Sequence, residues 1–232
     1  MSSTSATINK AGAFQSARRI NRSLTAAVEK QALQWMAARA PRWLTSDQLT
    51  ALGLSAQIAA GLCFALSRYN RYALLLAIVC IVLNWFGDSL DGTLARVRQQ
   101  QRPRYGFYVD HVLDAIGFFF LLTGLAFSGY MSPSVAYGFL VAYLLLSIEI
   151  YLATYTVGTF HLSYWSFGPT ELRILLVIGN LFALRNPHAV IAGREFLLFD
   201  LGFGIGTVAL AIILVQAVVK HTVQLYREET KW

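Results

Sequence analysis

The sequence predicts an all-α fold, a polytopic membrane bundle of about six transmembrane helices with an N-terminal juxtamembrane amphipathic helix. Asp, Glu, Lys and Arg together make up only 13% of the 232 residues, whereas ordinary soluble domains carry about 25%. The mean hydropathy is +0.51. Long stretches such as 48–67, 115–148 and 201–219 contain no charged residue, and about 20 apolar residues are enough to span a bilayer. These observations exclude an ordinary soluble enzyme.

Dividing the apolar stretches into lengths of about 20 residues predicts six spanning helices. The first begins at Thr45 and Gln48, which have the spacing of a capping box. The fifth is the least apolar, because it must include Glu171 and Arg173 near one end. The predicted ranges are 48–67, 72–96, 107–129, 133–158, 169–185 and 196–219.

The N-terminal part, residues 1–47, is predicted to be a basic segment separate from the transmembrane domain at 48–232. Within it, residues 24–44 combine leucine, valine, tryptophan and methionine with Lys30, Arg39 and Arg42. This composition suits a helix that lies in the plane of the lipid headgroups. A surface helix packed on the end of the bundle fits the same residues equally well.

Lys and Arg residues predict the orientation of the bundle. Fourteen of them fall in residues 1–47, in the loop after the second helix and in the C-terminal tail, against four on the opposite side. The positive-inside rule therefore places both termini and the 96–106 loop in the cytoplasm. Since the basic residues flank membrane helices, membrane lipid is the expected partner and nucleic acid is not. Cys63 and Cys80 lie in apolar stretches and indicate neither a disulfide framework nor a zinc site.

Four acidic residues lie where the second predicted helix ends and the third begins. Asp88 and Asp91 are three residues apart, and Asp110 and Asp114 are four apart, so each pair lies on one face of its helix. Ionised carboxylates at membrane depth cost several kcal/mol each when unpaired. Because all-oxygen sites favour hard cations, the acids predict two divalent metal ions, Mg²⁺ or Mn²⁺, of the kind that assist phosphoryl transfer.

Small residues accompany the acids. Gly92, Ala95 and Gly106 would keep the surface shallow where a ligand approaches the backbone. Tight helix packing is the alternative interpretation of the glycines.

The pattern Asp88-x₂-Asp91-Gly92-x₂-Ala95-Arg96-x₉-Gly106-x₃-Asp110-x₃-Asp114 resembles the signature of the CDP-alcohol phosphotransferase (CDP-alcohol phosphatidyltransferase) family, D-x₂-D-G-x₂-A-R-x₈-G-x₃-D-x₃-D. All eight fixed positions match, with one extra residue in the loop before Gly106, where an insertion is easily accommodated. The resemblance implies a six-helix membrane enzyme of phospholipid biosynthesis, with residues 48–232 as its catalytic domain and a site open to the cytoplasm. It also implies a homodimer.

The resemblance further implies transfer of a substituted phosphate from a CDP-linked donor, most simply CDP-diacylglycerol, to an alcohol with release of CMP. Asp88, Asp91, Asp110 and Asp114 would be metal ligands, and Asp114 would also be the base that deprotonates the acceptor hydroxyl. The nucleotide and diphosphate would contact Gly92, Ala95, Arg96 and Gly106.

Five further residues are candidates around this site. Arg104, Glu149, Glu171 and Arg173 are predicted to contact the acceptor. The alternative for Glu149 is a structural pair with Arg173 or a hydrogen-bonded carboxyl, and the alternative for Glu171 and Arg173 is a helix start held by an ion pair. His111 is turned about 100° from Asp110 around the helix, which favours packing or indirect support of the ligands over a role as base.

Two other functions compete with this interpretation. An aminoalcohol phosphotransferase would use CDP-choline or CDP-ethanolamine and a lipid alcohol, and the Asp110-His111 pair is similar to such members of the family. A divalent-cation transporter would explain intramembrane aspartates but not the joint spacing of Gly92, Ala95, Arg96 and Gly106. An inactive scaffold is disfavoured because none of the four acids is missing.

Overall fold

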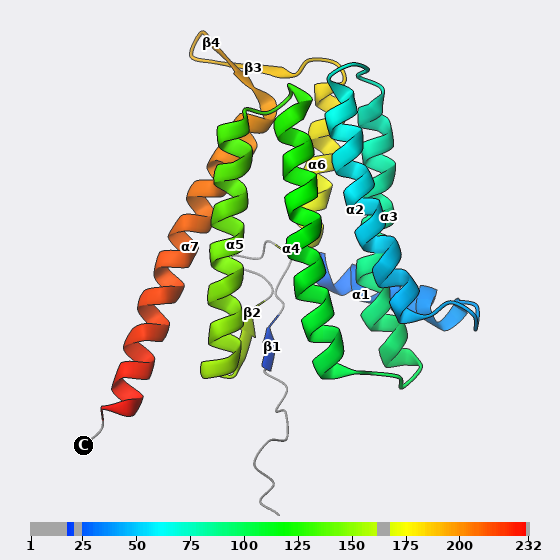
Figure 1. Cartoon of the computed structure of the whole chain (residues 1–232), viewed down its shortest axis with the longest axis vertical. Helices are drawn as coiled ribbons and strands as arrows, with labels where there is room; N and C mark the ends of the chain where they lie inside the picture. The colour runs from blue at the N-terminus through cyan, green and yellow to red at the C-terminus, as the bar shows by residue number, and fades with distance from the viewer. Residues whose placement is uncertain (1–17, 21–24, 162–167, 231–232) are drawn as a thin grey trace, which may run out of the picture.

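The computed structural model describes residues 18–20, 25–161 and 168–230. Residues 1–17 and 21–24 of the predicted basic N-terminal segment, including Leu24 at the start of the predicted interfacial helix, lie outside these residues. The described part folds as an all-α bundle with four short strands (Figure 1). Its helices are α1 Ala26–Arg39, α2 Ser46–Ser67, α3 Ala73–Val97, α4 Pro103–Ser128, α5 Pro133–Thr156, α6 Pro169–Ala183 and α7 Leu198–Glu229.

The predicted membrane bundle is confirmed, with one difference at its fifth helix. The helices α2, α3, α4, α5 and α7 are long and apolar enough to cross a membrane. In contrast, α6 has 15 residues and is about 22 Å long, which is shorter than a hydrocarbon core of about 30 Å. It begins part-way along the bundle rather than at its end (Figure 1), so its first residues lie at the depth of its neighbours' interiors.

The predicted capping box is present at the start of α2. Thr45 Oγ1 accepts a hydrogen bond from the Gln48 backbone at 3.2 Å, and the Thr45 backbone N–H donates to Gln48 Oε1 at 2.8 Å. At the other end of the chain, α7 continues ten residues beyond the predicted end at 219. The prediction ended the helix at the length that spans a bilayer. However, the sequence contains no helix-breaking residue at that point, and the helix buries Ala217 and His221 on either side of it.

The four strands form two pairs at opposite ends of the bundle (Figure 1). At one end, β3 His188–Ile191 and β4 Arg194–Leu197 form an antiparallel hairpin. Ala192 and Gly193 both have positive φ in its two-residue turn, as a type I′ turn requires. At the other end, β1 Arg18–Ile20 pairs in parallel with β2 Thr159–His161, just after α5.

Helix α1 crosses the bundle on the side of α3 (Figure 1). Its buried residues Leu33 and Ala37 pack in one apolar cluster with Leu49 of α2 and Leu90 and Leu94 of α3. Its exposed apolar residues are Val28 and Trp35. The helix therefore packs on the bundle and presents apolar side chains outward, and we call this end of the molecule the α1 end.

Two glycine contacts place α2 directly against α3 and α4. A methyl group on Gly87 of α3 would come within 2.6 Å of the Gly53 backbone nitrogen in α2. A methyl group on Gly124 of α4 would overlap the Gly61 carbonyl group in α2. The backbones approach closely because glycine leaves no side chain between them, so α2 holds α3 and α4 on its two sides.

We expect Gly124→Ala to destabilise the bundle. Because the added methyl group meets backbone rather than a movable side chain, we expect a cost of about 1–3 kcal/mol and a fall of roughly 5 °C in the temperature at which detergent-solubilised protein loses its monodisperse chromatographic peak. Gly138→Ala is the matched control, because no atom in the described part of the chain lies within 4 Å of its added methyl group. Equal melting of the two variants would contradict the close contact.

Candidate active site

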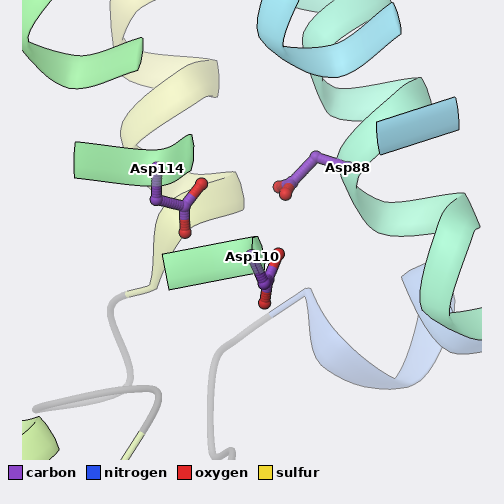
Figure 2. A group of neighbouring side chains, drawn as sticks. All are labelled: Asp88, Asp110 and Asp114. Atoms are coloured by element: carbon purple, nitrogen blue, oxygen red, sulfur yellow. The ribbon is translucent and has the colours of Figure 1, made fainter. Parts of the chain in front are cut away.

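Three aspartates meet inside the bundle. Asp88 comes from α3, and Asp110 and Asp114 come from successive turns of α4 (Figure 2). One carboxylate oxygen of each lies within 4.8 Å of the others, and all three side chains are half-buried. The two helices face each other here because both pack against α2, with Gly87 allowing α3 its close approach one residue before Asp88.

A cation from α6 lies at the same site. Arg173 Nη2 donates a hydrogen bond to Asp88 Oδ2 at 2.6 Å, and the Arg173 side chain is 14% exposed. Arg173 Nε donates to Asn84 Oδ1 at 2.9 Å. A charge-assisted pair at low exposure is stabilising only when its remaining hydrogen bonds are made, and Asn84 makes one of them.

Asn84 in turn connects α3 to α2. Its Nδ2 donates to the Gly53 carbonyl at 3.0 Å and to Gln57 Oε1 at 3.3 Å. A methyl group on Gly117 of α4 would overlap the Gln57 amide, so α4 also packs closely against this group. Polar side chains from α2, α3 and α6 therefore form one hydrogen-bonded network beside the aspartates.

The fourth predicted ligand, Asp91, lies apart from the group of three. Its Oδ2 accepts a 2.5 Å hydrogen bond from Thr50 Oγ1 of α2, and its Oδ1 accepts from the Gly92 backbone N–H. Ser46 Oγ donates to the Asp91 carbonyl at 2.9 Å. The first two turns of α2 thus hold Asp91, by its side chain and its carbonyl, one turn from Asp88.

Two clefts adjoin these residues. A cleft of about 260 Å³ is lined by all three aspartates and by Thr50, Gly53, Leu54, Gln57, Asn84 and Leu113. A second cleft of about 370 Å³ shares Gln57 and Asn84 with the first and continues over Arg173. The rest of its wall is apolar, formed by Ala60, Ile81, Phe118, Leu121, Pro169, Leu172 and Leu176. A polar and an apolar space therefore meet at Asn84 and Gln57.

The model of one protein family, described as CDP-alcohol phosphatidyltransferase, matches residues 43–221. The match covers all four aspartates and more than half of the chain. The chain belongs to the CDP-alcohol phosphatidyltransferase family. It is therefore a membrane transferase of substituted phosphate groups in phospholipid biosynthesis.

Among solved structures, the chain is similar to a crystal structure of Mycobacterium tuberculosis phosphatidylinositol phosphate synthase (PgsA1) with CDP-DAG bound. The sequence identity is 19% and the TM-score 0.57, over 83% of this chain and 92% of that one. At this identity the likeness supports the fold. No curated protein sequence matches the chain significantly.

The three clustered aspartates fit a divalent metal ion, as the family would lead one to expect. One oxygen of each carboxylate lies within 4.8 Å of the other two, and oxygens on opposite sides of one Mg²⁺ lie about 4 Å apart, so the three side chains are close enough to share an ion. A set of carboxylate oxygens without nitrogen or sulfur is the donor chemistry that Mg²⁺ and Mn²⁺ prefer. This transferase therefore has a candidate metal site at Asp88, Asp110 and Asp114.

The glycines of the family motif are not packing contacts between helices. Among the described residues, none has an atom within 4 Å of a methyl group built on Gly106, and one built on Gly92 meets only the Arg96 guanidinium, at 3.4 Å. In contrast, Gly53, Gly61, Gly87 and Gly124 contact neighbouring backbones. Within the described ranges, Gly92 and Gly106 therefore border open space and not a neighbouring helix.

Arg96 and Ala95 lie on the same turn as Gly92, at the end of α3. Arg96 is exposed, and its Nη2 donates to Thr93 Oγ1 at 2.8 Å. Two other arginines that follow α3 bind residues between the end of α1 and the start of α2. Arg98 donates to the carbonyls of Ala40, Pro41 and Leu44, and Arg102 pairs with Asp47.

The four residues predicted to contact the acceptor do not lie together in one site. Arg104 is exposed in the first turn of α4. Glu149 of α5 pairs with His221 of α7, with 2.5 Å between Oε1 and Nδ1, rather than with Arg173. Glu171 is buried and accepts hydrogen bonds from Thr25 and Gly168, so it closes the start of α6 without pairing to Arg173. Of the four, Arg173 is the one in contact with the aspartates.

His111 lies on α4 next to Asp110 and packs against aromatic side chains. Its Nδ1 lies 2.6 Å from the Phe107 carbonyl and 4.0 Å from Asp110 Oδ2. Its ring is tilted by 32° against the Phe107 ring, with 4.2 Å between the ring centroids, and packs edge-to-face with Tyr151 of α5, with 4.8 Å between the centroids. The histidine therefore joins α4 to α5 next to Asp110.

Sequence reasoning missed Thr50, Gln57 and Asn84, all of which line the first cleft. A signal was available: Thr50 and Gln57 are seven residues apart and Asn84 is four before Asp88, which puts each pair on one helix face. Polar residues at such spacing inside an uncharged membrane stretch indicate an interior face.

Proposed function

We propose that the chain transfers the phosphatidyl group of CDP-diacylglycerol to the hydroxyl of a polar alcohol and releases CMP. The observation that carries the proposal is the meeting of Asp88, Asp110 and Asp114 beside a polar cleft, in a chain of the CDP-alcohol phosphatidyltransferase family. The divalent ions would lower the negative charge of the diphosphate and of the leaving CMP.

A lipid donor is supported by the arrangement of the two clefts. The cleft over Arg173 is mostly apolar and meets the aspartate cleft at Asn84 and Gln57. A donor with a charged diphosphate and acyl chains needs both kinds of surface side by side. The similar M. tuberculosis synthase holds CDP-DAG, which supports the same choice here.

We assign metal binding to Asp88, Asp110 and Asp114, and propose Asp91 as a further ligand that completes a two-ion site. Thr50 holds the Asp91 carboxylate one turn from Asp88. Asp114 also serves as the base that takes the proton from the acceptor hydroxyl. We assign contacts with the nucleotide and diphosphate to Gly92, Ala95, Arg96 and Gly106, since Gly92 and Gly106 border open surface.

Arg173 is the best-placed residue for a contact with the acceptor, because its guanidinium already faces the carboxylates. We propose a supporting role for His111 and leave Glu149 and Glu171 to the packing of α5 and α6. Arg104 lies at the α1 end, where the basic loop predicts the cytoplasm. The proposed orientation therefore has both termini and the site opening in the cytoplasm, with a homodimer in the membrane.

The test is CMP release by purified protein in mild detergent with Mg²⁺ or Mn²⁺. CDP-diacylglycerol, CDP-choline and CDP-ethanolamine are each assayed against glycerol phosphate, inositol, inositol phosphate, serine and diacylglycerol. We expect release from CDP-diacylglycerol with one polar acceptor. Release only from an aminoalcohol donor with diacylglycerol would reverse donor and acceptor, and divalent-ion flux in proteoliposomes without any CMP release would replace the proposal by transport.

A further inference from the structure

One carboxylate oxygen of α1 joins three side chains from two other helices. Glu29 Oε1 accepts hydrogen bonds from Trp85 Nε1 at 2.8 Å, from Ser89 Oγ at 3.2 Å and from Thr170 Oγ1 at 2.9 Å. Trp85 and Ser89 belong to α3, and Thr170 belongs to α6. Glu29 is partly buried, and hydrogen bonds to a charged acceptor are about twice as strong as neutral ones.

The partners of Glu29 lie next to the residues that meet at the site. Ser89 follows Asp88 directly, and Thr170 is three residues before Arg173, one turn away on α6. The contact between Asp88 and Arg173 therefore depends on the same two helix segments that Glu29 holds together.

A second tie joins α1 to the start of α6. The Thr25 backbone N–H and Oγ1 donate to Glu171 Oε1 at 3.0 and 2.8 Å. Since α6 is too short to be held by the full thickness of a membrane, its depth and rotation must come from packing and polar contacts of this kind. Helix α1 supplies two such contacts.

In both sets of hydrogen bonds the residue at the α1 side, Glu29 or Thr25, precedes the range that the family model matches, which begins at residue 43. The match to the family model therefore does not account for Glu29 or for its hydrogen bonds to α3 and α6.

We propose that Glu29 is a positioning residue of the active site: by joining α3 to α6, it sets Arg173 against Asp88 and so holds the aspartates in their working arrangement. Its effect on catalysis rests on the proposed function, whereas its effect on helix placement does not. A displacement of about 1 Å between reacting groups is enough to reduce a rate by up to about a hundredfold.

Helix placement is tested by pulsed electron paramagnetic resonance, with spin labels at Val97 of α3 and Leu175 of α6. Both side chains are exposed, and Cys63 and Cys80 are replaced by alanine so that the labels attach only at these two positions. We expect one narrow distance distribution in the parent protein, a broadened one in Glu29→Ala and an unchanged one in Gln31→Ala. Gln31 is the matched control because it is an exposed residue of the same helix.

Catalysis is tested in the same variants by CMP release. We expect kcat to fall about tenfold in Glu29→Ala and less in Glu29→Gln, since the amide oxygen has two lone pairs for two of the three donors. In an Arg173→Lys background, Glu29→Ala should add less than a twofold loss, because both substitutions disturb one contact.

The inference would be overturned if Glu29→Ala left the distance distribution unchanged, or if it broadened the distribution but kept full activity. It would also be overturned if Glu29→Ala still caused a tenfold loss of kcat in the Arg173→Lys background. A parent protein that releases no CMP contradicts the proposed function instead, and the distance measurement then still decides whether Glu29 holds α3 and α6 together.

Discussion

Asp114→Asn is expected to reduce CMP release by about a thousandfold or more while leaving the bundle folded. Removing a base costs about 10²–10⁴ in rate, and this substitution also removes one of the three clustered carboxylates that we propose as metal ligands. Asparagine keeps the volume of the side chain, so the packing of α4 should survive. The measurement is kcat at saturating donor, acceptor and Mn²⁺, with the monodisperse chromatographic peak as the check of folding.

Glu195→Gln is the matched control for this charge removal, because Glu195 is exposed on the β3–β4 hairpin at the end of the bundle away from α1. It should retain full activity. If Asp114→Asn kept more than about a tenth of the parent kcat, Asp114 would not be the base.

Asp88→Asn is expected to have the largest effect on stability as well as to abolish metal-dependent activity. The substitution leaves the Arg173 guanidinium, which is 14% exposed, without its carboxylate partner. Breaking such a pair on one side costs about 3–5 kcal/mol, which corresponds to a fall of roughly 10 °C in melting temperature.

A double variant separates the two roles of Asp88. Asp88→Asn with Arg173→Met removes both charges, and replacing a buried pair by neutral groups is often close to neutral in stability. We therefore expect the double variant to melt near the parent protein but to release no CMP. If it melted as low as Asp88→Asn, the ion pair would not be the source of the lost stability.

Asp47→Asn is the control for this experiment. Asp47 pairs with Arg102, but both side chains are about half exposed, and such pairs contribute about 0–1 kcal/mol. A fall in melting temperature as large as that of Asp88→Asn would show that burial is not what distinguishes the two pairs.

Local features of the fold and site could be predicted from the sequence because they depend on residues close together in the chain. Thr45 and Gln48 are three residues apart, and their capping box is present. The acids fall on helix faces according to their spacing, which is why Asp88, Asp110 and Asp114 meet. Asp91 also shares a helix face with Asp88 but differs in its contacts, because Thr50 of α2 binds it.

Long-range contacts could not be predicted in the same way. Charge repulsion indicated that a cation must lie among the acids. Which cation lies there depends on where α6 begins in the bundle, and only the tertiary structure shows that Arg173 reaches Asp88. The partner of Glu149 is His221, 72 residues away. Glu29 binds residues 56 to 141 positions away, and no periodicity along the sequence records such distances.

The most direct test of the account is a titration of metal-depleted protein with Mn²⁺, in which bound Mn²⁺ is measured by electron paramagnetic resonance and CMP release from CDP-diacylglycerol is measured in the same samples. The account predicts no release before Mn²⁺ is added and activity that rises with occupancy of the site, with both signals lost in Asp110→Asn. Full activity in the metal-depleted protein, or saturated Mn²⁺ binding without CMP release from any donor, would contradict it.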